Sequence, residues 1–138
     1  MAENDAPVQR SEYIAHRKET EEQKWEEQPL HVHLKHTAEL ASKFASSFDA
    51  AEWGYFSGIV HDIGKYSQKF QRKIRGENIR VDHSTAGAQL AWNKNGLYQL
   101  MSYCIAGHHA GLPDSGSKQD DGSDGTLYGR LGKKVENY

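Results

Sequence analysis

The stretch WGYFSGIVHDIGK at residues 53–65 decides the fold that this sequence predicts. It contains three apolar residues at helical spacing, which predict a helix from about residue 50 to 61: Trp53, Phe56 and Val60. That helix ends at the pair His61-Asp62. A carboxylate can bridge two cations through its two oxygens while neutral imidazoles occupy other ligand positions. The pair therefore points to a two-metal hydrolytic site.

Helical periodicity continues on both sides of this stretch. We expect further helices over about residues 32–48, 65–76, 84–94, 97–109 and 127–137. Two apolar stripes are expected to face the core. The first comprises Thr37, Leu40, Ala41, Phe44, Ala45 and Phe48, and the second comprises Leu97, Leu100, Met101, Cys104 and Ile105. The predicted fold is mainly α, a helical bundle with a short N-terminal strand or hairpin.

Length and composition limit the possible functions. The 138 residues fit one domain, which we expect at residues 30–138 after an irregular lead-in at residues 1–29. The sequence contains no phosphate-loop motif, no apolar run long enough to cross a bilayer, and no signal peptide. A single cysteine, Cys104, excludes an internal disulfide. These features predict a cytoplasmic protein with no membrane partner.

Charge is distributed unevenly along the chain. The formal net charge of −2 argues against a generally basic nucleic-acid binder. A basic segment nevertheless follows the His-Asp pair, and four of its cations would share one face of a helix: Lys65, Lys69, Arg72 and Lys73. A solvated amphipathic helix and a phosphate-binding face both explain this pattern.

Five histidines fall at predicted helix ends or on inward faces: His33, His61, His83, His108 and His109. Any one of them alone is more often a core or surface histidine than a metal ligand. Their joint placement, with Asp62 as the bridging acid, favours a metal site. A cysteine-based zinc site is excluded by the cysteine count, and no nucleophile-elbow motif supports a Ser-His-Asp triad.

Four motifs occur in order along the chain. They are His33-x-x-x-Thr37, His61-Asp62-Ile63-Gly64-Lys65, Asp82-His83-Ser84-Thr85-Ala86-Gly87-Ala88 and Gly107-His108-His109-Ala110-Gly111-Leu112-Pro113-Asp114. This ordered set resembles the HD-type nuclease domain of the CRISPR type I interference nuclease-helicase, a member of the HD phosphohydrolase superfamily. The resemblance runs from about Tyr13 to the C-terminus.

The resemblance implies a metal-dependent nuclease that cleaves single-stranded DNA in CRISPR antiviral defence. A helicase segment or chain and an RNA-guided surveillance complex would be its partners. One metal would bind His33, His61 and Asp62, and the other would bind Asp62, His83, His108 and His109. Lys65 would lie beside the scissile phosphate, and Lys69, Arg72 and Lys73 would contact the nucleic acid. We expect one or two divalent ions per chain, with Mn, Ni, Co or Fe favoured over Mg by the imidazole-rich ligand set.

The sequence departs from the family pattern in one respect. The family has a further Asp on a late helix that completes the first metal site, and this chain ends before it. The domain therefore resembles one truncated at its C-terminus. We expect the acids that remain in the downstream loop to be solvated: Asp114, Asp120, Asp121 and Asp124. The first metal site should be the weaker one, and nuclease activity should be reduced.

Two alternatives remain open at this point. An HD-type nucleotide phosphohydrolase would use the same metal geometry on a different phosphoester. A catalytically inactive remnant that only binds DNA or a partner protein would explain both the missing acid and the basic helix.

Overall fold

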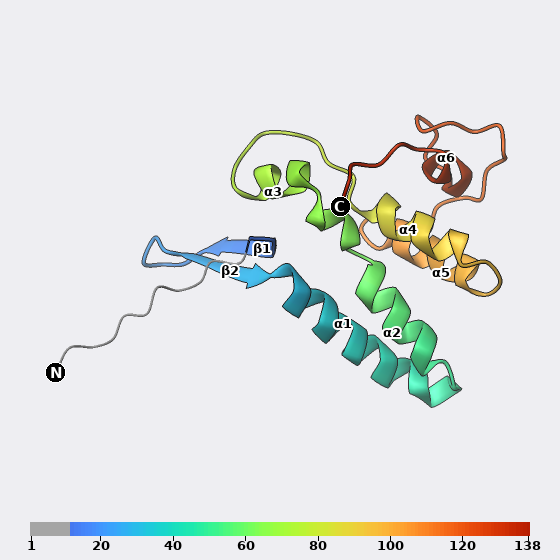
Figure 1. Ribbon diagram of the computed structural model, residues 1–138, viewed down its shortest axis with the longest axis horizontal. Helices are drawn as coiled ribbons and strands as arrows, with labels where there is room; N and C mark the ends of the chain where they lie inside the picture. The colour runs from blue at the N-terminus through green and yellow to red at the C-terminus, as the bar shows by residue number, and fades with distance from the viewer. Residues whose placement is uncertain (1–11) are drawn as a thin grey trace.

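A β-hairpin leads into a set of short helices in the computed structural model, which describes residues 12–138 (Figure 1). The elements follow in the order β1 (Ile14–Glu19), β2 (Trp25–Pro29), α1 (Leu30–Ala45), η1 (Ser46–Phe48), α2 (Ala51–Val60), η2 (Ile63–Tyr66), α3 (Gln68–Ile74), α4 (Ser84–Asn93), α5 (Tyr98–Gly107) and α6 (Leu127–Leu131). The expected mainly α fold with an N-terminal hairpin is confirmed. Residues 1–11 of the expected irregular lead-in lie outside the described part of the chain.

Two helix pairs form the body of the molecule. Helix α1 lies along α2, and α4 lies along α5 (Figure 1). The first pair is in backbone contact, because a Cβ atom added at Gly58 of α2 would collide with the backbone of Ala38 in α1. Only glycine allows so close an approach. This contact fixes the position of His33 on α1 relative to His61 at the end of α2.

Alanines and aliphatic side chains together form the buried core of the helical body. The main cluster of buried residues comprises Val60, Ala88, Ala91, Ile105, Ala106 and Leu127. The expectation that both predicted apolar stripes face the core is wrong for their largest members, since Phe44 is 65% exposed and Leu100 is 55% exposed. Leu40, Phe48, Leu97 and Cys104 are exposed as well. Where α1 meets α2, the close contact of Ala38 with Gly58 leaves Phe44 and Phe48 outside.

The hairpin is attached to the helical body by side chains from η2 and α3. Gln71 accepts a hydrogen bond from the backbone N–H of Ile14 (3.0 Å) and donates to the carbonyl of Ile14 (3.0 Å). Lys65 donates to the carbonyl of Ala15 (3.2 Å). These contacts bring β1 against the segment that follows the His-Asp pair.

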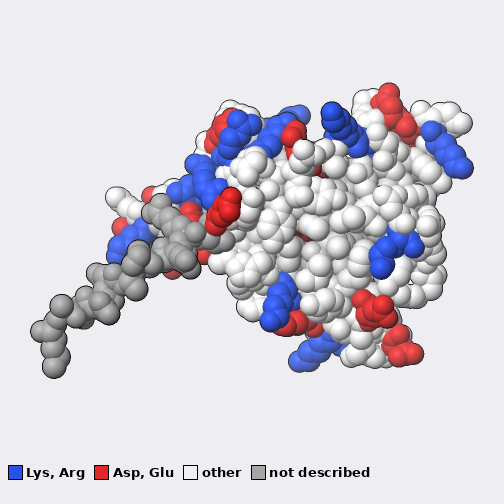
Figure 2. All heavy atoms as spheres, in the orientation of Figure 1, with Lys and Arg blue, Asp and Glu red and all other residues white. Residues whose placement is uncertain are grey.

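The charged side chains are distributed unevenly over the face shown in Figure 2. They are sparse over the helical body and gather above the hairpin and α3. Within residues 12–138, no helix is long and apolar enough to cross a membrane.

Candidate metal centre

Asp62 is the centre of a cluster of histidines. It follows α2, is only 3% exposed, and directs each carboxylate oxygen toward a different group of rings. Its Oδ2 lies 3.1 Å from Nε2 of His33 and 3.3 Å from Nε2 of His61. Its Oδ1 faces the second group, with Nε2 of His83 at 3.3 Å, of His108 at 3.2 Å and of His109 at 4.0 Å. The structure thus brings together all six residues that the sequence predicts as metal ligands.

Helix ends supply most of these ligands. His61 directly follows α2, His83 precedes α4, and His108 and His109 follow α5. Only His33 comes from within a helix, at the start of α1. Residues at helix ends can change direction without breaking the helix, so four separate elements can aim imidazoles at one carboxylate.

Two of the rings have their proton positions fixed by backbone carbonyls. Nδ1 of His61 lies 2.7 Å from the carbonyl oxygen of Gly58, and Nδ1 of His108 lies 2.7 Å from that of Ile105. A carbonyl oxygen only accepts, so both Nδ1 atoms must carry the proton. When such a ring is neutral, its Nε2 carries the lone pair and faces Asp62. This arrangement is typical of metal-binding histidines, whose second nitrogen is oriented by a backbone or carboxylate acceptor.

The ligand atoms also crowd one another. Nε2 of His33 is 3.2 Å from Nε2 of His61, and Nε2 of His83 is 2.8 Å from Nε2 of His109. Lone pairs this close to each other and to a carboxylate repel unless a cation or proton lies between them. Nitrogen atoms of this kind bind first-row divalent metals at about 2.0–2.1 Å. The residues therefore fit a divalent metal ion on each side of Asp62.

Without metal, protons on the histidine rings would stabilise the crowded imidazole nitrogens and the Asp62 carboxylate. Burial opposes ionisation of Asp62, but hydrogen bonds from His108, His33, His61 and His83 outweigh it and hold the pKa of that carboxyl far below its usual range. Burial likewise opposes protonation of His108, yet its bonds to Asp62 and to the Ile105 carbonyl raise its pKa. Burial, followed by the neighbouring His108 and His83, lowers the pKa of His109.

His16 is a member of this site that sequence reasoning missed. The nearest ligand atoms of His16, His33 and Asp62 all lie within 4.8 Å of one another. The His16 ring lies edge-on to that of His33, with centroids 4.8 Å apart. His16 is on β1, outside any helical stripe, so no periodicity marks it. Its position immediately after a buried pair, Ile14-Ala15, is the only sequence signal that it lies at the edge of the core.

Lys65 is buried beside Asp62 rather than on the surface. It is 3% exposed, and its Nζ donates to Oδ2 of Asp62 at 2.8 Å and to the carbonyl of Ala15 at 3.2 Å. The expectation that Lys65 shares a helical face with Lys69 is wrong. Ser67 adopts an extended conformation, ends η2 and caps α3 by accepting from the Phe70 N–H, so the two lysines lie on separate elements.

The other predicted nucleic-acid contacts lie on α3. Lys69 forms an ion pair with Glu136 (3.5 Å) and Arg72 one with Glu77 (3.5 Å). The acids of the downstream loop are not among the clustered metal-ligand groups of the described residues. Instead they hold local turns: Asp120 accepts from Ser117 and Thr126, and Asp121 accepts from Ser123.

Comparison with known proteins agrees with this geometry. The family model for the HD domain matches residues 14–134. The chain belongs to the HD domain family. HD domains are generally metal-dependent hydrolases of the phosphohydrolase superfamily, and the His and Asp cluster is the expected place for their divalent metal ions. A search of curated proteins finds no match to the chain. The matched region includes the β-hairpin, and thus His16, as well as the helices.

Proposed function

We propose that this HD domain is a two-metal nuclease that hydrolyses phosphodiester bonds of single-stranded DNA in CRISPR antiviral defence. The observation that carries the two-metal proposal is the division of ligands at Asp62, one group of imidazoles for each carboxylate oxygen. The ordered motifs that contain these ligands support the nuclease role. A helicase on another segment or chain, and an RNA-guided complex, would deliver the strand.

Each residue has a defined part in this proposal. Two divalent ions, when bound, would supply an activated water and offset negative charge on the phosphate. Asp62 would hold both ions at a fixed separation, and the imidazoles would complete each ligand set. Lys65 donates to the same carboxylate oxygen that faces His33 and His61, so it orients Asp62. Its ammonium would also help to offset negative charge that develops on the phosphate in the transition state.

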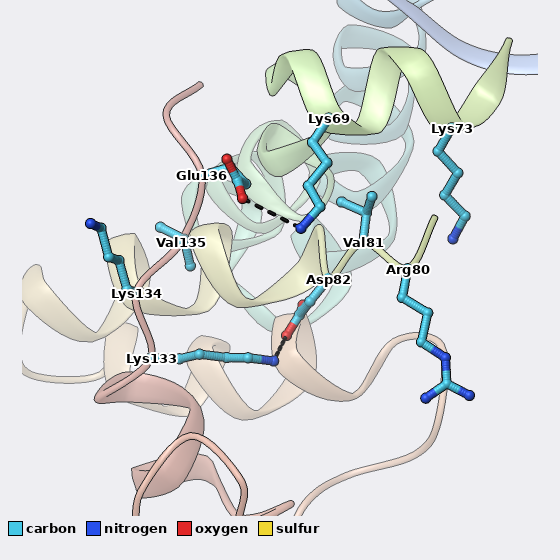
Figure 3. Close-up of a pocket in the computed structure, with 9 residues that line it drawn as sticks. All are labelled: Lys69, Lys73, Arg80, Val81, Asp82, Lys133, Lys134, Val135 and Glu136. Carbon is cyan, nitrogen blue, oxygen red and sulfur yellow. Dashed lines mark hydrogen bonds and ion pairs between the residues drawn. The ribbon is translucent and has the colours of Figure 1, made fainter. Parts of the chain in front are cut away.

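A basic cavity, lined in part by the residue that precedes the candidate ligand His83, would bind the strand (Figure 3). Its volume is about 440 Å³, and it lies between α3, the segment before α4 and the C-terminal residues. Five cations line it: Lys69, Lys73, Arg80, Lys133 and Lys134. Asp82, also in the lining, directly precedes the candidate ligand His83. The cavity and the metal centre therefore share one short segment.

The cations outnumber the acids in this cavity. Lys133 pairs with Asp82 (2.8 Å) and Lys69 with Glu136 (3.5 Å), as Figure 3 shows. Lys73 and Arg80 have no acidic partner within the described residues, and Figure 3 shows both side chains extending away from the two ion pairs. Unpaired cations in a cavity favour a phosphate-bearing ligand over a neutral one. This surplus supports a nucleic-acid substrate.

The proposal is tested by incubating the protein with Mn²⁺ and either labelled single-stranded DNA or a panel of nucleotides. We expect metal-dependent DNA cleavage that Asp62→Ala abolishes together with metal binding. Nucleotide turnover without DNA cleavage would instead identify a nucleotide phosphohydrolase. Metal-independent DNA binding that survives Asp62→Ala, with no turnover of either substrate, would identify an inactive binding module.

Replacement of two of the cations without an acidic partner tests the cavity separately. The double variant Lys73→Ala/Arg80→Ala should weaken binding of single-stranded DNA. The slope of log affinity against log salt should fall by about 1.4, or about 0.7 for each phosphate that the variant no longer neutralises. Lys43→Ala is the matched control, since Lys43 is exposed at the far end of α1. An unchanged slope in the double variant would assign these cations to ordinary solvation.

A further inference from the structure

The first ligand group at Asp62 is smaller than the second. Each carboxylate oxygen has two imidazole nitrogens within 3.3 Å, and Oδ1 has a third, that of His109, at 4.0 Å. Among the histidines of residues 12–138, only His33 and His61 pair with Oδ2 within that longer distance. Four ligands are the usual minimum for a tightly held transition metal. A further donor on the Oδ2 side would make the two sites equivalent.

We propose that His16 of the β-hairpin is this donor, a fourth protein ligand to the metal beside His33, His61 and Asp62. This inference rests on the proposed two-metal centre, but not on any particular substrate. It makes the hairpin part of the metal centre rather than an appendage to the helical domain.

The distances around Oδ2 fit a single metal ion. His33, His61 and Asp62 are separated by 3.1 to 3.3 Å, close to the spacing of about 3.4 Å between neighbouring ligands of a tetrahedral ion with bonds of about 2.1 Å. Ligand atoms on opposite sides of one ion are about 4.2 Å apart. The ligand atom of His16 lies within 4.8 Å of those of both His33 and Asp62, and binding would require its exposed ring to turn toward the ion.

A β-bulge directs the side chain of His16 toward the metal centre. This bulge lies between Ile14 and His16, because Ile14 pairs with Pro29 and His16 with the adjacent Gln28. The bulge lets two consecutive residues, Ile14 and Ala15, be buried while the next side chain points toward His33. Bulges often occur beside functional sites, where they redirect a side chain.

Two polar side chains fix this bulge to the metal-binding segment. Gln71 bonds both the N–H and the carbonyl of Ile14, and also donates to the carbonyl of Lys65 (2.8 Å). Lys65 in turn joins Ala15 to Asp62. The position of His16 relative to Asp62 is therefore set by a short chain of buried hydrogen bonds, the kind of support that metal ligands require.

Zinc binding to the complete chain tests the inference without reference to catalysis. Titration calorimetry should show two binding events in the unmodified protein. His16→Gln should weaken one event at least about 100-fold, since loss even of an outer partner of a ligand costs about 10–100-fold. The other event should remain unchanged. His31→Gln is the matched control, because His31 is an exposed histidine of α1 outside both ligand groups.

A direct measurement guards against an indirect effect of the substitution. In the unmodified protein labelled with ¹⁵N, zinc should shift an imidazole nitrogen of His16, assigned by its absence in His16→Gln. An unshifted His16 nitrogen at zinc saturation, or two undiminished binding events in His16→Gln, would overturn the inference. If the His16 results hold but no DNA is cleaved, the inference stands and the proposed nuclease function fails.

Discussion

The buried pair between Asp62 and Lys65 should couple the metal centre to the stability of the fold. Both side chains are 3% exposed, and their charged atoms are 2.8 Å apart. At an effective dielectric constant of about 20, this separation corresponds to about 6 kcal/mol of Coulomb attraction. Local relaxation reduces what a substitution reveals, and removal of one partner from a buried pair costs about 3–5 kcal/mol.

We expect Asp62→Asn and Lys65→Met each to destabilise the metal-free protein by about 3 kcal/mol. The double variant should be destabilised by clearly less than the sum, with a coupling energy of about 3 kcal/mol, because it leaves no unpaired charge. Urea unfolding in the presence of a chelator measures all four proteins. The exposed pair Lys35 and Glu39, 3.8 Å apart on α1, is the control and should couple by about 0.3–0.5 kcal/mol. Additivity of the buried pair within about 0.5 kcal/mol would refute this reasoning.

Two further substitutions test how the centre is held. Gly64→Ala would place a Cβ atom against the carbonyl oxygen of His83. We therefore expect it to displace His83 and to weaken metal binding on the Oδ1 side, as measured by calorimetry. Unchanged binding of both metals would show that this contact does not restrict the position of His83. Although desolvation raises the pKa of Asp82, hydrogen bonds from Lys133 and Thr85 lower it well below the usual range. A lowered pKa contributes stability above about pH 4, the unfolded value, that is lost as pH falls toward the folded value. Because solvent screens the interactions of this exposed residue, Asp82→Asn should cost only about 1 kcal/mol at pH 7. It should also flatten the fall in stability below about pH 4 that unmodified protein shows in urea unfolding.

The helices of this protein could be predicted because their periodicity is strong. The predicted ranges 32–48 and 84–94 correspond closely to α1 with η1 and to α4. The face that each helix buries could not be predicted from hydrophobicity alone. Phe44 and Phe48 are the largest apolar residues of their segment, yet both are exposed because α1 meets α2 through Ala38 and Gly58. Close backbone packing stabilises a helix pair only when both helices have small residues at the contact. The apolar stripe of one helix does not show which residues its partner has there.

The candidate site could be predicted further than the core. Histidines at helix ends stand out in a sequence, and all five predicted ones surround Asp62. His16 could not be found in this way because its position depends on a bulge and on side chains more than 45 residues away. A helical pattern continued through Ser67 puts Lys65 on the surface, whereas the chain is in fact extended at Ser67.

The hydrogen bonds from His61 to Gly58 and from His108 to Ile105 have a consequence for local motion. Each acceptor is among the last four carbonyls of its helix, which lack a partner within that helix. The rings of these two candidate metal ligands thus act as C-terminal caps. An ion that fixes these rings also prevents the last turns of α2 and α5 from fraying, so slower amide hydrogen exchange in those turns would accompany metal binding. Order at two helix ends and occupancy of the centre are parts of the same equilibrium.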